Sequence, residues 1–317
     1  MSGGWGRCWA GWSPLGSTGK EDFAYQNNAY DHTYTSPNDT SVQLRCIKQS
    51  VSTSTLTTIG QDDAPEKPKD PPVQLYESFI LPCIAEYVGM TLFVFIICLV
   101  SAYGSTAGPT WLLGVSLTTG FSFFSLLIAI GPVSGAHLNP VVTMGITLAG
   151  DFNPILGIPY VIAQIAGSMT GACFTKIIVP SNIYTDCLGG AHSVGPGVTA
   201  GGAILCEVLI TAFLILIILM SGVDSANSQQ PLPPLAIALA VVVGITCGGP
   251  FSGGSMNPAR AFGPAVASGV WDHHYVWWVG PLLGGLVSAG IYRILMASED
   301  RRVLLWKRSQ KKDTTST

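Results

Sequence analysis

Long apolar segments separated by short connections fill the chain from about residue 71 to residue 297. Each segment is close to the roughly 20 residues that a helix needs to cross the hydrocarbon core of a bilayer. The pattern therefore predicts an all-α membrane protein. Six spanning helices are expected, over about 76–103, 110–131, 156–179, 199–221, 232–250 and 274–296. Small residues inside them, as in Gly167-x-x-x-Gly171, predict close helix packing in lipid.

The two ends of the chain have a different character. Residues 1–70 are rich in Ser, Thr, Asp and Asn and show no sustained periodicity, which predicts a disordered cytosolic tail. Residues 298–317 are rich in Lys and Arg and predict a second, basic cytosolic tail. The folded domain is therefore expected to cover residues 71–297.

Positive charge is almost absent from the apolar body. Of 15 Lys and Arg residues, only Lys176 and Arg260 lie between Pro71 and Tyr292, and a soluble domain of that length would need a charged surface. Basic residues flank the first and sixth spans, so the positive-inside rule places both termini in the cytosol, which requires an even number of spans. No basic block suits nucleic acid, and the eight cysteines form no metal-binding pattern.

Two connections, 132–155 and 251–273, are too long and too apolar for ordinary loops. Both contain Ser-Gly-x-x-x-Asn-Pro, with Asn139 in the first copy and Asn257 in the second, 118 residues later. Glu86 and Glu207, in spans one and four, recur at nearly the same interval. A repeat with three spans per unit, about 76–185 and 199–296, must place its halves in opposite orientations.

Each Asn-Pro pair predicts the start of a short helix, because Asn caps and Pro fits the first turn. Two re-entrant half-helices of about ten residues would then meet near the membrane midplane, N-terminus to N-terminus. Their dipoles place positive potential there, and both Asn side chains can donate to a passing water. Arg260 adds a positive charge that would exclude protons and cations beside a pore and offer donors to neutral polar solutes.

These motifs resemble those of the aquaporin (major intrinsic protein) family over roughly residues 76–296. The resemblance lies in Ser-Gly-Ala-His-x-Asn-Pro, in Asn257-Pro258-Ala259-Arg260 and in Trp278-Val279-Gly280-Pro281. Within the family the chain is most similar to the aquaporin-8 type, the aquaammoniaporins. Pro82-Cys83 with Glu86 and the run from Asn257 to Ala265 support that finer assignment.

The resemblance implies a right-handed bundle of six spanning helices plus two half-helices, assembled as a homotetramer with one pore per protomer. It implies that Glu86 and Glu207 hold the half-helices by accepting backbone hydrogen bonds; a proton relay is the alternative for such intramembrane acids. The implied pore motifs are Asn139, Pro140, Val141, Asn257, Pro258 and Ala259. The implied selectivity constriction is Thr119, Ile245, Gly254 and Arg260.

Two of these residues depart from the family pattern. Val141 stands where Ala is usual, which reshapes packing below the first half-helix but keeps its cap. Thr119 stands where the aquaporin-8 type has His, so the constriction loses a hydrogen-bond donor and gains space. His192 is expected near the outer face.

The function expected from the resemblance is a passive channel for water, ammonia and hydrogen peroxide, with no enzymatic activity and no cofactor. A broader channel for urea or glycerol is an alternative, although Ala261 stands where glycerol-conducting relatives carry Asp. A junctional or scaffold protein is a further alternative. An ion channel or transporter would need more charged groups in the spans. The plasma membrane is the expected residence, ahead of an intracellular membrane.

Overall fold

The computed structural model describes residues 70–104, 110–224, 226 and 232–303. The chain divides into two units, Met1–Lys67 and Pro68–Thr317, and all described residues lie in the second. The predicted tail over 1–70 and most of the basic tail over 298–317 therefore lie outside the described residues.

Six helices of the described part are long and apolar enough to cross a membrane, which confirms the predicted number of spans. Their ends lie within about five residues of the predicted ones. The spans are Pro71–Gly104, Trp111–Ser134, Pro154–Ile178, Ala200–Val223, Pro233–Ser252 and Val276–Met296.

Three spans are single α-helices, and three contain a π-helical turn, which is internal in the first span and at the C-terminal end in the other two. The first comprises α2 (Pro71–Leu75), η1 (Tyr76–Ile80) and α3 (Leu81–Gly104), and the next two are α4 (Trp111–Ser134) and α6 (Pro154–Ile178). The last three are α8 (Ala200–Ile218) with η4 (Leu219–Val223), α9 (Pro233–Ser252), and α11 (Val276–Ile291) with η6 (Tyr292–Met296). Among the described residues, four short helices lie between spans: α5 (Pro140–Ala149), α7 (Ser181–Asp186), η3 (Leu188–Gly190) and α10 (Pro258–Ser268).

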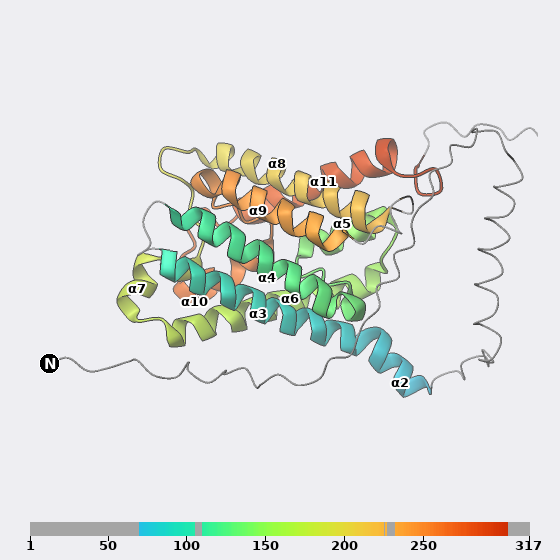
Figure 1. Cartoon of the computed structure of the whole chain (residues 1–317), viewed down its shortest axis with the longest axis horizontal. Helices are drawn as coiled ribbons and strands as arrows, with labels where there is room; N and C mark the ends of the chain where they lie inside the picture. Colours follow the sequence, from blue (N-terminus) through green and yellow to red (C-terminus); the bar gives the residue numbers. More distant parts are fainter. Residues whose placement is uncertain (1–69, 105–109, 225, 227–231, 304–317) are drawn as a thin grey trace, which may run out of the picture. The chain divides into compact units, whose positions relative to one another are not determined.

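The helices of the two repeats pack in the same pattern. In the first repeat α3 packs on α6 and α4, and in the second α8 packs on α11 and α9. The repeats join where α4 meets α9 and where each half-helix meets a span of the other repeat, as α10 meets α6 and α5 meets α11. Figure 1 shows the spans running side by side along its horizontal axis, with α2 at one end and α7 at the other.

Glycines allow the closest of these contacts. A Cβ on Gly171 of α6 would lie 2.3 Å from the Thr91 carbonyl oxygen of α3. In the second repeat, a Cβ on Gly284 of α11 would lie 2.5 Å from the Val208 carbonyl oxygen of α8. Backbone approaches this close explain why small residues stand at these sites in helices that pack in lipid.

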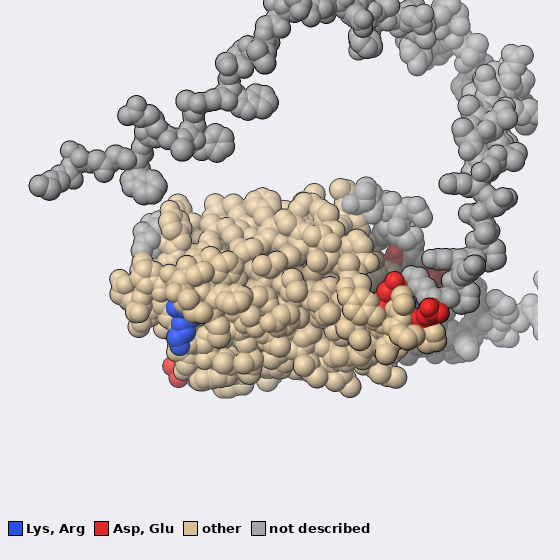
Figure 2. Space-filling model, turned by 90° about the horizontal axis from the view of Figure 1, so that it is seen from below, with Lys and Arg blue, Asp and Glu red and all other residues tan. Residues whose placement is uncertain are grey.

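The outer surface of the bundle is apolar along its length. Many large apolar side chains of the spans are exposed, including Ile155 and Ile162 on α6 and Phe121 on α4. In the face that Figure 2 shows, coloured charged residues gather near the two ends and the length between them is free of them. A surface of this kind is stable against lipid and unstable in water.

Residues 298–303 extend the folded unit beyond the boundary expected at residue 297. The backbone N–H of Ser298 donates to Asp224 Oδ2 at 2.9 Å, and that of Val303 donates to the Arg293 carbonyl at 2.7 Å. Arg301 forms an ion pair with Asp151 at 2.7 Å. This turn ties the end of the sixth span to the loop that follows the first half-helix.

Candidate pore

The loops that lead into the two half-helices have the same unusual backbone. α4 and α9 each end at a serine, and the next residue, Gly135 or Gly253, is left-handed with φ of 82° or 83°. Leu138 and Met256, directly before the two asparagines, also have positive φ, at 48° and 55°. A positive φ strains a non-glycine residue by about 1–3 kcal/mol. The surrounding contacts must therefore hold both loops in place.

The asparagines cap the half-helices as the sequence predicts. Asn139 Oδ1 accepts from the backbone N–H of Val141 at 2.9 Å, at the start of α5. Asn257 Oδ1 accepts from the backbone N–H of Arg260 at 3.1 Å, at the start of α10. Each cap satisfies one of the N–H groups that the first turn of a helix leaves without an internal partner.

The same two side chains link the repeats to each other. Asn139 Nδ2 donates to the Met256 carbonyl at 2.9 Å, and Asn257 Nδ2 donates to the Leu138 carbonyl at 2.7 Å. The N-terminal ends of both half-helices therefore meet at one place. Because a carboxamide nitrogen carries two hydrogens, each Asn keeps a second N–H beyond this link.

Glu86 holds the first loop from span one. Its Oε1 accepts from the Ser134 hydroxyl at 2.8 Å and from the backbone N–H of His137 at 2.9 Å. Its Oε2 accepts from the backbone N–H of Leu138 at 2.7 Å and from Gln164 Nε2 at 2.8 Å. The carboxylate is fully buried, and its four donors compensate part of the cost of burial.

Glu207 holds the second loop with one donor fewer. Its Oε1 accepts from the Ser252 hydroxyl at 2.7 Å and the backbone N–H of Ser255 at 2.8 Å, and its Oε2 accepts from the backbone N–H of Met256 at 2.8 Å. Gln164 has no counterpart there, because the position 117 residues later is Pro281. Arg260 provides a nearby positive charge in the second repeat instead.

Val141, the unusual residue of the first motif, is fully buried against span six. A Cβ on Gly285 of α11 would lie 2.5 Å from Val141 Cγ1, so the larger side chain fills the space that this glycine leaves. The bulk of Val141 is thus directed away from the Asn139 cap and toward α11.

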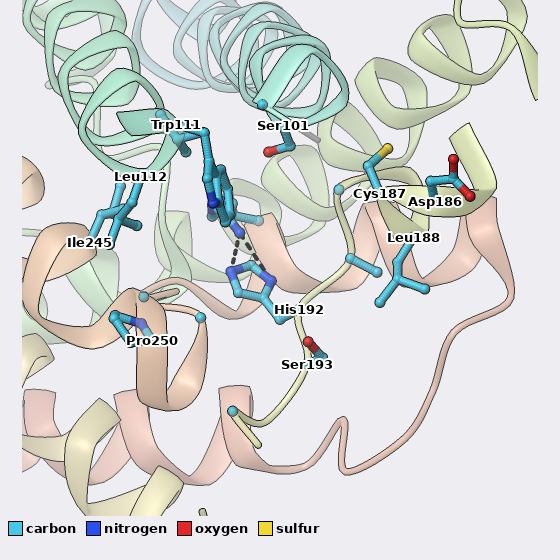
Figure 3. A pocket seen from close by; sticks show the side chains of 18 of the residues that line it. Ser101, Trp111, Leu112, Asp186, Cys187, Leu188, His192, Ser193, Ile245 and Pro250 are labelled. Atoms are coloured by element: carbon cyan, nitrogen blue, oxygen red, sulfur yellow. Dashed lines mark hydrogen bonds between the residues drawn. The ribbon is translucent and has the colours of Figure 1, made fainter. Parts of the chain in front are cut away.

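A cavity of about 620 Å³ opens above the half-helices, between the loop over residues 186–196 and the facing ends of α3, α4 and α9 (Figure 3). Arg260 and Ile245 line it, together with Trp111, Leu112 and Val115 of α4. We call this cavity the vestibule.

The four predicted constriction residues do not all reach the vestibule. Gly254 packs on Ile245, since a Cβ at Gly254 would lie 2.9 Å from Ile245 Cα. Thr119 is buried one turn beyond Val115, and its hydroxyl donates to the Val115 carbonyl at 2.7 Å. The structure thus places Ile245 and Arg260 in the wall of the vestibule and Gly254 behind Ile245, and neither Gly254 nor Thr119 is among the residues that line the cavity.

His192, from the loop after span three, touches the Arg260 side chain. Its Nδ1 lies 3.0 Å from Arg260 Nη1, and its Nε2 also contacts that nitrogen (Figure 3, dashed lines). Arginine can only donate, so the ring must supply a lone pair and be neutral. Burial lowers the pKa of His192 well below its usual value, and the charge of Arg260 lowers it further. The sequence placed His192 near the outer face but did not pair it with Arg260.

The low pKa predicts a stability change with pH. The unfolded chain takes up a proton on His192 as the pH falls through about 6.5, and the folded protein does not. Thermal stability in detergent should therefore fall below about pH 6.5, while water flux stays constant from pH 8 to 6.5. Glutamine keeps a hydrogen-bond acceptor for Arg260 but does not titrate. His192→Gln should therefore make the thermal stability depend less steeply on pH. An unchanged slope in the variant would contradict this assignment.

A comparison with protein families decides which group of proteins has this architecture. The family model of the major intrinsic proteins matches residues 76–292. The chain belongs to the major intrinsic protein family. Like other major intrinsic proteins, it is an integral, multi-pass membrane protein of a family of channels for small neutral solutes.

Several curated major intrinsic proteins are similar along most of the chain. Aquaporin-8 of Mus musculus is 38% identical over 234 residues, which cover 74% of this chain and 88% of that protein. Aquaporin A of Dictyostelium discoideum is 36% identical over 73% of this chain and 82% of its own length. Aquaporin TIP2-1 of Arabidopsis thaliana is 38% identical over 68% and 88%.

A solved structure shows the same fold. The X-ray structure of the aquaglyceroporin from Plasmodium falciparum superposes with a TM-score of 0.58 at 22% sequence identity. The match covers 67% of this chain and 95% of that one. The predicted aquaporin-like fold, with six spans and two half-helices, is therefore confirmed.

Proposed function

We propose that the protein is a passive channel that conducts water, ammonia and hydrogen peroxide and excludes protons and ions. The observation that carries the proposal is the meeting of both half-helix N-termini below the vestibule, joined by Asn139 and Asn257. Two helix dipoles directed at one point create a positive potential that repels protons and cations. The free N–H of each Asn offers a donor to a water oxygen.

Arg260 supports the selection of neutral solutes. It is buried at the vestibule, and its Nε has no partner within the described residues. With Nη1 held by His192, the guanidinium presents N–H donors and positive charge but no acceptor. Water, ammonia and hydrogen peroxide all carry a lone pair that such donors can bind, whereas ammonium and hydronium are repelled.

The small side chains of the constriction favour the passage of solutes somewhat larger than water. Ile245 and Gly254 contribute no aromatic ring and no hydrogen-bonding side chain beside Arg260. The chain's similarity to the proteins named aquaporin-8 is in keeping with this type of channel. A broader channel for urea or glycerol, or a scaffold protein without transport, would give different fluxes in the following test.

Purified protein in liposomes provides that test. We expect stopped-flow shrinkage in sucrose well above that of empty vesicles, together with faster ammonia and peroxide uptake and no proton leak. Water permeability equal to that of empty vesicles would refute the channel and favour a scaffold. Large glycerol flux would favour the broader channel.

Thr119→His tests the place of the constriction. Histidine is larger and adds a donor, so flux of ammonia and peroxide should fall about tenfold while water flux changes less. Thr119→Ser keeps the hydroxyl that donates to Val115 and serves as the control. Equal solute fluxes in wild type and Thr119→His would show that this turn of α4 does not face the pore.

We further infer a homotetramer with both termini in the cytosol and residence in the plasma membrane. The exposed apolar side chains of the spans suit contact with lipid and with neighbouring copies. Protease digestion of sealed cells, with antibodies against each end of the chain, tests the orientation, and mass measurement in detergent tests the tetramer.

A further inference from the structure

The half-helices also end in matching ways. α5 is followed by Gly150 and α10 by Gly269, both left-handed, with φ of 85° and 81°. The last carbonyls of a helix have no partner inside it and carry the negative end of its dipole. Both half-helices are surrounded by apolar spans, so these carbonyls need a donor from elsewhere.

A basic side chain of the opposite repeat supplies that donor in each case. Lys176, in the last turn of α6, donates from Nζ to the Ala267 carbonyl near the end of α10, at 2.5 Å. Arg293, in η6 after α11, donates from Nη1 to the Ala149 carbonyl at the end of α5, at 2.9 Å. The acceptors lie 118 residues apart and the donors 117 apart. The contact is thus repeated by the internal symmetry.

The placement of Lys176 needs a reason of its own. It is one of two Lys or Arg residues between Pro71 and Tyr292, and it lies exposed in the last turn of α6, where a long cationic side chain can reach the polar interface in several directions. The Tyr184 ring lies 5.9 Å from its Nζ, a distance at which the ring face attracts an ammonium group. Tyr184 and Ala267 together therefore fix where the Lys176 head group lies.

We propose that Lys176 and Arg293 are a matched pair of positioning residues, one for each half-helix of the pore. The inference rests on the channel function proposed above. Each half-helix is only about 15 Å long, so a movement at its C-terminal end is passed to the Asn at its other end. Glu86 and Glu207 hold the N-terminal ends, and the two cations hold the opposite ends.

The pair also adds to the electrostatics of the pore. Two positive charges lie on opposite sides of the Asn pair, about 15 Å from it along the half-helices. Both raise the potential at the place where the half-helix dipoles already oppose proton passage. Loss of either charge should therefore affect proton exclusion more than water flux.

Lys176→Met and Arg293→Met test the proposal in liposomes that hold a pH-sensitive dye and a potassium ionophore. We expect the ratio of proton conductance to water permeability to rise at least threefold in each variant, and further in the double variant. The ratio comes from one vesicle preparation, so it does not depend on how much protein folds. Lys176→Arg and Arg293→Lys keep the charge and should keep the wild-type ratio.

Matched controls distinguish the loss of the positive charge from the effect of any substitution in this part of the helix. Ile177→Met and Ile294→Met change exposed neighbours and should leave the ratio unchanged. Lys176→Gln and Arg293→Gln keep a hydrogen-bond donor without the charge, and serve if the methionine variants fold poorly. If the wild type conducts water and every neutral variant keeps its ratio of proton conductance to water permeability, the proposed role of Lys176 and Arg293 is wrong. The proposed channel function would not be affected by that result. A wild type without water permeability would instead refute the proposed channel.

Discussion

Replacement of Glu207 by leucine should abolish water permeability and strongly destabilise the solubilised protein. The buried carboxylate accepts hydrogen bonds from the Ser252 hydroxyl and from the backbone N–H groups of Ser255 and Met256. Leucine has a similar size but no acceptor, so the N–H groups of Ser255 and Met256 lose their partner and the Ser252 hydroxyl keeps only the Gly248 carbonyl at 3.4 Å. Each unsatisfied donor costs about 1–3 kcal/mol. The strained Met256 would also be released, and Asn257 with it.

Thermal unfolding in detergent and stopped-flow water flux measure the two effects. Glu207→Gln keeps one acceptor oxygen but turns an amide N–H toward a donor, so it should lie between leucine and wild type. Glu299→Gln removes an exposed acid near the chain end and should change neither quantity. A Glu207→Leu protein with wild-type water flux would show that the carboxylate does not position the second half-helix.

The spans and half-helices follow from the sequence because their signals are local. An apolar run has the length of a bilayer, and Asn-Pro fixes a helix start without any distant partner. The internal repeat then sets the topology, since three spans per unit invert the second half. The prediction of six spans therefore agrees with the structure to within a few residues.

The contacts between repeats could not be predicted in this way. The links from Asn139 to Met256 and from Asn257 to Leu138 join residues more than 100 positions apart, and they depend on left-handed conformations that non-glycine residues rarely adopt. Nothing in Ser-Gly-x-x-x-Asn-Pro specifies that conformation. In that conformation the backbone N–H groups of Leu138 and Met256 donate to Glu86 and Glu207, which lie on distant spans.

The constriction was predicted from the resemblance to the family, and a matched sequence position does not give the depth of a side chain in the pore. Ile245 and Arg260 line the vestibule, whereas Thr119 lies one turn deeper than Val115. His192 was missed as a partner because it comes from a loop with no fixed spacing to Arg260. The pairing could have been suspected from Arg260 itself. A buried arginine needs a hydrogen-bond acceptor, and the apolar spans around it offer few, so a histidine in a nearby loop is a natural candidate.

Lys176 shows how the repeat can be used further. By charge alone it is only one of two cations between Pro71 and Tyr292. Its distance of 117 residues to Arg293 is one residue short of the 118 between the two motifs, and this near-equality supports the shared role proposed for the two cations. The repeat interval therefore finds functional pairs even where the two residue types differ.

Gly171→Val should prevent most of the protein from folding. Its Cβ would lie 2.3 Å from the Thr91 carbonyl oxygen and 2.9 Å from the Phe95 backbone nitrogen, both on α3. These are backbone atoms, so no side-chain rotation can relieve the clash, and α6 must move away from α3. Overpacking of a tight contact costs about 1–3 kcal/mol, and valine adds two further methyl groups beyond the clashing Cβ. The movement would also displace Gln164 from Glu86 and Lys176 from the second half-helix.

Gly114 provides the matched control, because it lies on α4 and a Cβ there meets nothing within 4 Å. Gly114→Val should keep the yield, the unfolding temperature and the water flux near those of wild type, whereas Gly171→Val should lower all three. Gly171→Ala should fall between them, since it introduces the clash without the extra methyl groups. Gel filtration of tagged protein gives the folded yield. A normal yield and unfolding temperature for Gly171→Val would mean that α3 and α6 are not held together by this backbone contact.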